Sequence, residues 1–155
     1  MGRKGRKASK AGPETARDCT DAVLVSLQLH LNTLPPGAEI GVTLALPGAC
    51  VSGRMVSAET WATSMAAMAD SGFDTGGPSE VGNYMRQLAK PWADARTRWA
   101  ARADGDVGPF DPPQFVHLLD AQYLSGGALV PSAGVPWRGR LDNVSGWSYG
   151  LLCAG

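Results

Sequence analysis

The stretch Ile40-Gly-Val-Thr-Leu-Ala-Leu-Pro-Gly-Ala-Cys-Val-Ser-Gly-Arg-Met-Val-Ser57 decides the fold of this 155-residue chain. From residue 40 to residue 46, large apolar side chains alternate with smaller ones, which is the period-two pattern of a half-buried strand. Pro47-Gly48 indicates a turn, and residues 51–57 predict the returning strand of an antiparallel hairpin. Gly53 within that second strand is typical of a sharp bend or a close backbone approach, which is how small barrels close.

Apolar residues at helical spacing precede this hairpin. Residues 18–34 therefore predict an amphipathic helix, with Thr20 or Asp18 as its N-cap and with Pro35-Pro36-Gly37 as its end. The face of this helix that is expected to turn toward the core consists of Val23, Leu24, Leu27, Leu31 and Leu34.

Helical spacing returns after the hairpin and predicts a helical insertion at about residues 58–113. The apolar stripe of its first helix, over residues 58–69, favours core packing over ligand binding, because Met and Trp commonly fill gaps in cores. Ser79 is the expected N-cap of a second helix, and Pro91 is expected to open a further helical turn. The apolar residues of these three segments are Trp61, Met65 and Met68; Val81, Met85 and Leu88; and Trp92 and Trp99.

Strand signals dominate the last third of the chain. Residues 115–124, 137–144 and 146–152 predict three strands, with a turn at residues 125–127 and a loop that contains Pro131 and Pro136. The link between the last two strands is so short that they must form a hairpin or bend sharply into a neighbouring sheet. Large apolar area makes Trp137 and Trp147 candidate core or interface anchors.

The element order defines the expected fold class, α+β. A helix, a curved hairpin and three further short strands are similar in order to an Sm-like barrel, here with the helical insertion before the third strand. We therefore expect one domain over residues 18–155, built on a small five-stranded antiparallel barrel, preceded by a disordered basic tail over residues 1–17.

Charge is distributed unevenly along the chain although its net value is zero. Residues 1–17 carry six basic residues and one acidic residue, and the remainder carries eight basic and thirteen acidic residues. A basic tail and an acidic body attract each other between copies of a chain. The expected partner-binding residues are Arg3, Lys4, Arg6, Lys7 and Lys10 in the tail, and Trp137, Arg138, Arg140 and Trp147 in the body.

The chain lacks the residue constellations of the common enzyme classes. Its two histidines, His30 and His117, each stand alone on an apolar element, which is typical of a structural role. Asp104 and Asp106 lie in a turn that lacks the other ligands of a calcium loop. We expect a non-enzymatic protein with no catalytic residues, no cofactor and no metal site.

The three cysteines form no C-x-x-C pair, and no apolar run approaches the length of a membrane helix. Both observations favour a cytoplasmic protein without a membrane partner. The overall balance of charge makes nucleic acid an unfavoured partner, although the basic tail leaves that route open.

A closer resemblance covers residues 20–69 and 115–152. The segments 39–44, 51–57, 115–121 and 137–147 resemble those of the U-type (GvpU-like) accessory proteins of bacterial gas vesicles. This resemblance implies a small cytoplasmic protein that takes part in the assembly and clustering of gas vesicles. It also implies that the strand around Trp137 and the strand around His117 serve as structural or contact elements.

Two functions follow as expectations. The first is a non-enzymatic gas vesicle accessory protein that associates with itself and with gas vesicle shell or accessory proteins. The alternative is an Sm-like RNA-binding protein that uses the basic tail and the segment around Trp92, Arg96, Arg98 and Trp99, in which basic residues and tryptophans interleave.

Overall fold

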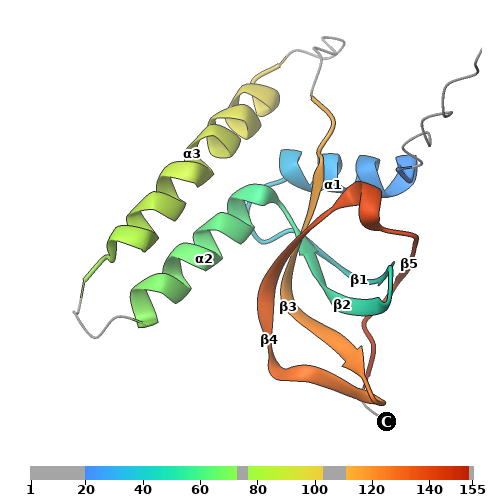
Figure 1. The fold of residues 1–155 in the computed structure, drawn as a ribbon. Helices are drawn as coiled ribbons and strands as arrows, with labels where there is room; N and C mark the ends of the chain where they lie inside the picture. Colours follow the sequence, from blue (N-terminus) through green and yellow to red (C-terminus); the bar gives the residue numbers. More distant parts are fainter. Residues whose placement is uncertain (1–19, 73–76, 103–110, 154–155) are drawn as a thin grey trace, which may run out of the picture.

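The computed structural model describes residues 20–72, 77–102 and 111–153. These residues form three helices, one short 3₁₀ turn and a five-stranded sheet (Figure 1). In chain order the elements are α1 (Ala22–Thr33), β1 (Glu39–Leu46), β2 (Ala49–Val56), α2 (Ala58–Gly72), α3 (Glu80–Ala100), β3 (Phe115–Ser125), β4 (Ala128–Arg140), η1 (Leu141–Asn143) and β5 (Gly146–Tyr149).

The sheet confirms the predicted mixed helical and antiparallel class. Its strands lie in the order β4-β3-β2-β1-β5, and every neighbouring pair is antiparallel. The predicted hairpin is β1 and β2, in which Glu39 pairs with Val56 and Leu46 pairs with Ala49 across the Pro47-Gly48 turn. Figure 1 shows the sheet strongly curled, with α1 across one end and the α2–α3 pair projecting to one side.

Closure of the sheet into a barrel is not confirmed. Within the described part of the chain, β4 pairs only with β3 and β5 pairs only with β1. The sheet is therefore open between β4 and β5, and each of these strands has one free edge.

The glycine of the second strand lies where the predicted close approach occurs. A side chain at Gly53 would place its Cβ 3.0 Å from the Leu119 carbonyl oxygen and 3.1 Å from the Ala121 Cα. The pairing of β2 with β3 shifts register between Ser52 and Arg54, and Asp120 on the opposing strand has a φ of 50°. Bulges of this kind increase local twist and bend a strand, which explains the curl of the sheet here.

The start of α1 differs from the prediction. Asp21 is the N-cap, rather than Thr20 or Asp18, and its Oδ1 accepts hydrogen bonds from the backbone N–H groups of Val23 at 2.8 Å and Leu24 at 3.0 Å. A carboxylate directly before the helix satisfies two N–H groups that otherwise lack partners, which is why the helix begins here.

The core lies between α1 and the concave face of the sheet. Leu24 and Leu31 from α1 are fully buried in a cluster with side chains from β1, β2 and β3. Burial of one such leucine contributes about 1.5–3 kcal/mol. The buried strand residues of this cluster are Val42, Leu44, Val51, Met55, Val116, Leu118 and Ala121.

The α2–α3 pair corrects two expectations for the insertion. The buried face of α2 consists of Ala58, Ala62 and Ala66, whereas Met68, predicted to be a core residue, is 50% exposed. Small alanines allow two helices to pack closely, and Met68 turns outward, while Trp61 and Met65 are half-buried. The segment after Pro91 is no separate element, because α3 is one 21-residue helix with Pro91 on its exposed side, where the freed carbonyl of the preceding turn is open to water.

The last strands differ from the prediction in their bounds. Pro131 and Pro136 lie inside β4 rather than in a loop. Proline lacks the N–H of a ladder bond, and it is tolerated here because β4 is an edge strand. Of the two alternatives for the end of the chain, the sharp bend is confirmed, since η1 turns the chain and β5 pairs with β1 instead of with β4.

Candidate functional site

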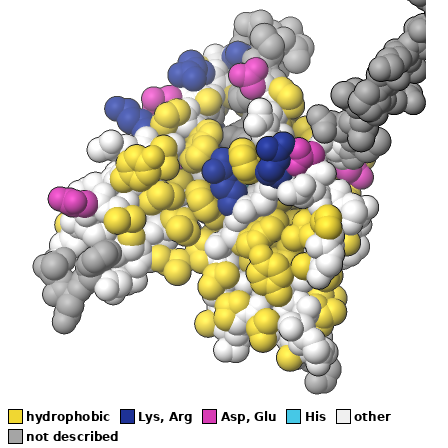
Figure 2. Space-filling view, viewed as in Figure 1, with side chains coloured by type: hydrophobic (Ala, Val, Ile, Leu, Met, Phe, Trp, Pro, Cys, Tyr) yellow, Lys and Arg dark blue, Asp and Glu magenta, His cyan; other side chains and the backbone are white. Residues whose placement is uncertain are grey.

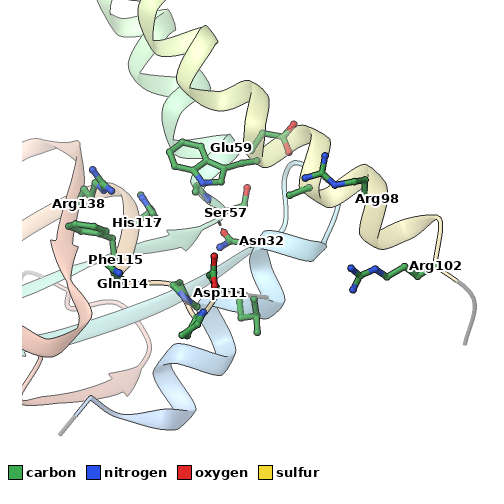
Figure 3. Close-up of a pocket in the computed structure, with 16 residues that line it drawn as sticks. Asn32, Ser57, Glu59, Arg98, Arg102, Asp111, Gln114, Phe115, His117 and Arg138 are labelled. Carbon is green, nitrogen blue, oxygen red and sulfur yellow. Dashed lines mark hydrogen bonds between the residues drawn. The ribbon is translucent and has the colours of Figure 1, made fainter. Parts of the chain in front are cut away.

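An open cavity of about 620 Å³ lies where the α2–α3 pair meets α1 and the first residues of β3 (Figure 3). We call it the junction cavity. Its walls come from five elements and include polar, aromatic and basic side chains. Those used below are Asn32, Ser57, Glu59, Trp92, Arg98, Phe115, His117 and Arg138. The cavity is of the size that proteins use to hold small molecules.

His117 borders the cavity from β3 and is 4% exposed. Its ring packs against Trp61 at 5.3 Å and against Trp92 at 6.1 Å between centroids. Neither ring nitrogen has a hydrogen-bond partner among the described residues. Burial and, to a lesser extent, the charge of the nearby Arg138 lower the pKa of His117 to about 3, so the imidazole is neutral at physiological pH.

Arg138 lies beside His117 at the cavity wall and comes from the paired position on β4. Its guanidinium carbon lies 3.7 Å from the centroid of the Phe115 ring, a close cation–π contact. No carboxylate of the described segments forms an ion pair with Arg138. Burial lowers the pKa of its guanidinium, which nevertheless stays charged at physiological pH. The stacking contact holds the guanidinium plane while its N–H edge remains open to a further partner.

Hydrogen bonds fix the opposite wall of the cavity. Asn32 Oδ1 accepts from the backbone N–H of Ala58 at 3.0 Å, and Ser57 Oγ accepts from the backbone N–H of Thr60 at 3.1 Å. Both bonds satisfy N–H groups of the first turn of α2. These contacts set where α2 leaves the sheet and therefore how wide the cavity is.

Glu59 joins the two helices at the cavity rim. Its carboxylate accepts bonds from Nε of Arg96 at 2.8 Å and from Nη2 of the same residue at 3.1 Å. The Glu59 carboxylate raises the pKa of Arg96. Arg98 also faces the cavity, and no ion pair is found for it within the described ranges. The basic character of the cavity therefore comes largely from Arg98 and Arg138.

The predicted contact residues of the body do not gather in one patch. Trp137 is half-buried against the core, and its Nε1 donates to the Tyr123 hydroxyl at 2.6 Å. Arg140 is bound to Asp142 through Nε at 2.9 Å, and this arginine lowers the pKa of the carboxylate. Trp147 packs on the core from β5 and meets Tyr149 edge-on at 5.0 Å. Arg138 alone of these residues lines the junction cavity. The five tail residues Arg3, Lys4, Arg6, Lys7 and Lys10 lie outside the described residues.

The tryptophan- and arginine-containing segment of α3 is not a continuous base-stacking surface. Trp92 packs against His117 and borders the junction cavity, Arg96 is held by Glu59, and Arg102 lies over the Trp99 ring at 5.3 Å. Stacking along a nucleic-acid strand needs successive exposed aromatic faces. Three of the four segment residues named for the RNA-binding alternative are thus engaged within the protein, and its tail residues lie outside the described part of the chain.

Sequence reasoning did not find Asn32, Ser57 or Phe115 as members of a site. A signal was present, since Gln28 and Asn32 stand four residues apart on an otherwise apolar helix, where polar side chains share one face. Buried polar side chains of this kind require hydrogen-bond partners. The spacing of residues along the sequence does not show partners that lie far away along the chain.

The described residues contain no group of three or more His, Cys, Asp or Glu side chains that is arranged to hold a metal ion. The described helices are each too short or too polar to cross a membrane.

Apolar side chains are also exposed in two areas away from the cavity (Figure 2). One area lies on the helix pair, and the other lies at the outer end of β3–β4 and along β5. Figure 2 shows apolar side chains over both regions, with basic side chains between them. The residues concerned are Met68, Val81, Tyr84 and Leu88 on the helices, and Leu124, Val130, Tyr149 and Leu151 on the sheet.

The described residues define a small α+β protein with three helices and an open five-stranded antiparallel sheet. A family model described as "Gas vesicle protein GvpU-like" matches residues 21–152. The chain therefore belongs to the GvpU-like family of gas vesicle proteins, which confirms the resemblance found in the sequence. Comparisons with curated proteins and with solved structures found no match.

Proposed function

We propose that this chain is a non-enzymatic gas vesicle accessory protein of the cytoplasm that associates with itself and with gas vesicle components, and so assists vesicle assembly or clustering. The observation that carries the proposal is the pair of free sheet edges on β4 and β5 in a member of a gas vesicle family. An exposed edge presents unpaired N–H and C=O groups and pairs readily with another strand.

The two edges differ, so a contact between them joins one copy to the next. The β4 edge of one copy faces the β5 edge of another, which generates a ring if the rotation closes and a filament or cluster if it does not. Pro131 and Pro136 lack N–H groups and restrict pairing to the end of β4, from Trp137 to Arg140. This short segment matches the four residues of β5 in length.

Apolar and charged groups support the same association. Tyr149 is 64% exposed and Leu151 is 51% exposed beside the β5 edge, so a second copy would remove apolar area from water. The basic residues of segment 1–17 and the acidic excess of the remainder add a long-range attraction that salt screens.

Self-association is tested by sedimentation velocity on the full chain. The backbone N–H groups of successive β5 residues point to opposite sides. The N–H of Gly150 bonds to Gly41 on β1 in register with the β1–β5 pairs, so the N–H of Ser148 also points to β1 and the N–H of Tyr149 points to the free edge. We expect Tyr149→Pro to reduce association more than the matched Tyr149→Ala, which keeps the N–H. Equal association of both variants would reject the edge contact.

The electrostatic part has its own test. A full-length variant in which Arg3, Lys4, Arg6, Lys7 and Lys10 are replaced by Gln should associate less at low salt and should match the parent protein at high salt. Vesicle association is tested by flotation, in which purified gas vesicles should carry the protein to the surface. Protein that stays in the lower fraction would contradict this part of the proposal.

A further inference from the structure

The junction cavity has features of a ligand site that a role in self-association does not use. It lies on the opposite side of β3 and β4 from the core, between the sheet and the α2–α3 pair, and away from β5 (Figures 1 and 3). Its volume of about 620 Å³ is within the range of small-molecule sites. Nothing in the edge contact requires such a cavity to exist.

Unpaired charge is the first observation. Arg138 and Arg98 both face the cavity, and neither has a carboxylate partner among the described residues. Two carboxylates also line the cavity: Glu59 is bound to Arg96, and Asp111 forms no ion pair with either arginine. Two arginines without an ion-pair partner at a concave surface attract an anion.

An unsatisfied buried group is the second observation. The His117 ring is almost completely buried, and both of its nitrogens lack partners within the described segments. Buried polar atoms in native proteins nearly always have a partner, so an orphaned pair at a cavity wall needs a reason. A neutral imidazole offers one donor and one acceptor, and this suits a ligand that carries polar atoms beside its charge.

The remaining walls are apolar and flat. Trp92 and Phe115 contribute aromatic surface, and Pro112 and Pro113 contribute rigid apolar surface. Because Phe115 already holds the guanidinium of Arg138 in position, an anionic group would meet a preorganised N–H edge at little entropic cost. The apolar walls then suit a ring or hydrocarbon body attached to that anion.

We propose that the junction cavity binds a small organic anion, with its carboxylate or phosphate group on Arg138 and its planar apolar body against Trp92, while Arg98 on the α3 wall adds positive charge. The shared chemistry of the ligand is one acidic group on one flat ring. A free aromatic carboxylate and a nucleoside monophosphate both satisfy this description, and the experiment separates them.

Calorimetric titration of the full-length protein supplies the first test. The probes are benzoate and AMP, with benzyl alcohol and adenosine as uncharged counterparts and with acetate and inorganic phosphate as anions without a ring. We expect benzoate or AMP to bind, and each counterpart to bind at least about tenfold more weakly, since each lacks either the charge or the body. Failure of both benzoate and AMP to bind would overturn the proposal.

Matched variants place the binding in the cavity. Arg138→Gln should weaken binding about tenfold, which corresponds to one charge-assisted contact, and Arg98→Gln should weaken it by a smaller factor through loss of nearby charge. Lys90→Gln, an exposed basic residue of α3 that does not line the cavity, should leave binding unchanged. Binding that survives in both arginine variants would locate the anion elsewhere, such as on the basic segment 1–17, and would overturn the proposal.

The two histidines give an independent readout. In ¹H–¹⁵N spectra of the imidazole rings, the His117 signals should move when benzoate or AMP binds, whereas the signals of His30, exposed on α1, should stay in place. Movement of neither ring, or of His30 alone, would contradict binding at the cavity. Sedimentation of the Arg98→Gln variant, whose residue lies on α3 outside the edge contact, should match the parent protein, so loss of ligand binding and loss of self-association are distinguishable.

Discussion

The side-chain amide of Gln28 bridges the backbones of Val56 and His117 at the point where β2 and β3 separate. Nε2 of Gln28 donates to the Val56 carbonyl oxygen at 2.9 Å, and Oε1 accepts from the backbone N–H of His117 at 3.1 Å. Because Met55 pairs with Leu118, Val56 and His117 are the next pair of the ladder, and the amide takes the place of their direct backbone bond. This bridge fastens α1 to two strands and holds them apart beside the junction cavity.

Replacement of Gln28 by Leu should destabilise the fold strongly. Leu has nearly the same volume, but it leaves the Val56 carbonyl and the His117 N–H without partners in a fully buried position. Each unsatisfied group costs about 1–3 kcal/mol, so we expect a loss of about 2–4 kcal/mol in the free energy of unfolding. Denaturant unfolding followed by tryptophan fluorescence measures this loss.

Gln87 offers a matched control for that experiment. It is exposed on α3, and Gln87→Leu should change the free energy of unfolding by less than about 0.5 kcal/mol. If the two leucine variants unfold at the same denaturant concentration, the bridge contributes nothing and the interpretation is wrong.

Gly53→Ala should also destabilise the protein, because the added methyl group has no room beside the backbone of β3. The added Cβ would lie 3.0 Å from the Leu119 carbonyl oxygen and 3.1 Å from the Ala121 Cα, and both are backbone atoms that yield only if β3 moves. Overpacking of this kind costs about 1–3 kcal/mol. Gly146→Ala, where no atom lies within 4 Å of the new Cβ, should leave stability nearly unchanged in the same thermal or denaturant unfolding measurement. Equal losses in both variants would contradict the close approach.

The hairpin and the role of Gly53 could be predicted from the sequence because both are local. Alternation of side chains over β1 reports directly on which face is buried, and a glycine inside a strand has few other uses. The capping role of Ser79 was predictable for the same reason, since its side chain accepts from the N–H of Gly82 only three residues away.

The junction cavity could not be predicted, because it depends on contacts between distant segments. Gln28 meets His117 across 89 positions, and Glu59 meets Arg96 across 37 positions. The two prolines of β4 were misread since a proline signals a loop unless its strand is known to lie at an edge. Pro91 was likewise interpreted as the start of a helical turn. Its place inside α3 depends on its exposure to solvent, which tertiary packing decides and the local sequence does not show.

Ser79→Ala should loosen the joint between α2 and α3. Ser79 Oγ accepts from the Gly82 N–H at 2.9 Å, while the Asp70 carboxylate at the end of α2 accepts from the Ser79 N–H at 2.8 Å and from Arg86 at 2.7 Å. Loss of an N-cap costs about 1 kcal/mol. Hydrogen exchange of the amides in the first turn of α3 should become faster in this variant.

Two comparisons keep that prediction specific. Ser148→Ala, at an exposed position on β5 far along the chain from α3, should leave the same amides unchanged. Bonds from Arg86 and then from Ser79 lower the pKa of Asp70 to about 2, so Asp70 stays ionised from pH 7 to pH 5. The ratio of the exchange rates in Ser79→Ala and in the parent protein should therefore be the same at both pH values. Unaltered exchange at Asn83 and Tyr84 in the variant would show that the cap does not hold the helix start.

The buried imidazole of His117 should make stability depend on pH. Burial lowers its pKa to about 3 in the folded protein, whereas the ordinary value in the unfolded chain is 6.5. Between these two values the unfolded chain binds more protons than the folded chain, so stability is present above pH 6.5 and is lost as the pH falls below it. From pH 7.5 to pH 5 the free energy of unfolding should fall by about 2 kcal/mol.

This range of pH separates His117 from the carboxylates that titrate in the protein. Hydrogen bonds lower the pKa values of Asp21, Asp70 and Asp142, so these groups lose their protons well below pH 5 and remain charged throughout the measurement. His117→Gln should abolish most of the pH dependence, whatever its effect on absolute stability, because the variant has no imidazole to protonate on unfolding. His30→Gln is the matched control and should keep the dependence of the parent protein, since it removes an imidazole that is exposed on α1. If the parent protein is equally stable at pH 7.5 and pH 5, the folded protein does not disfavour the protonated His117 ring, and the prediction is wrong.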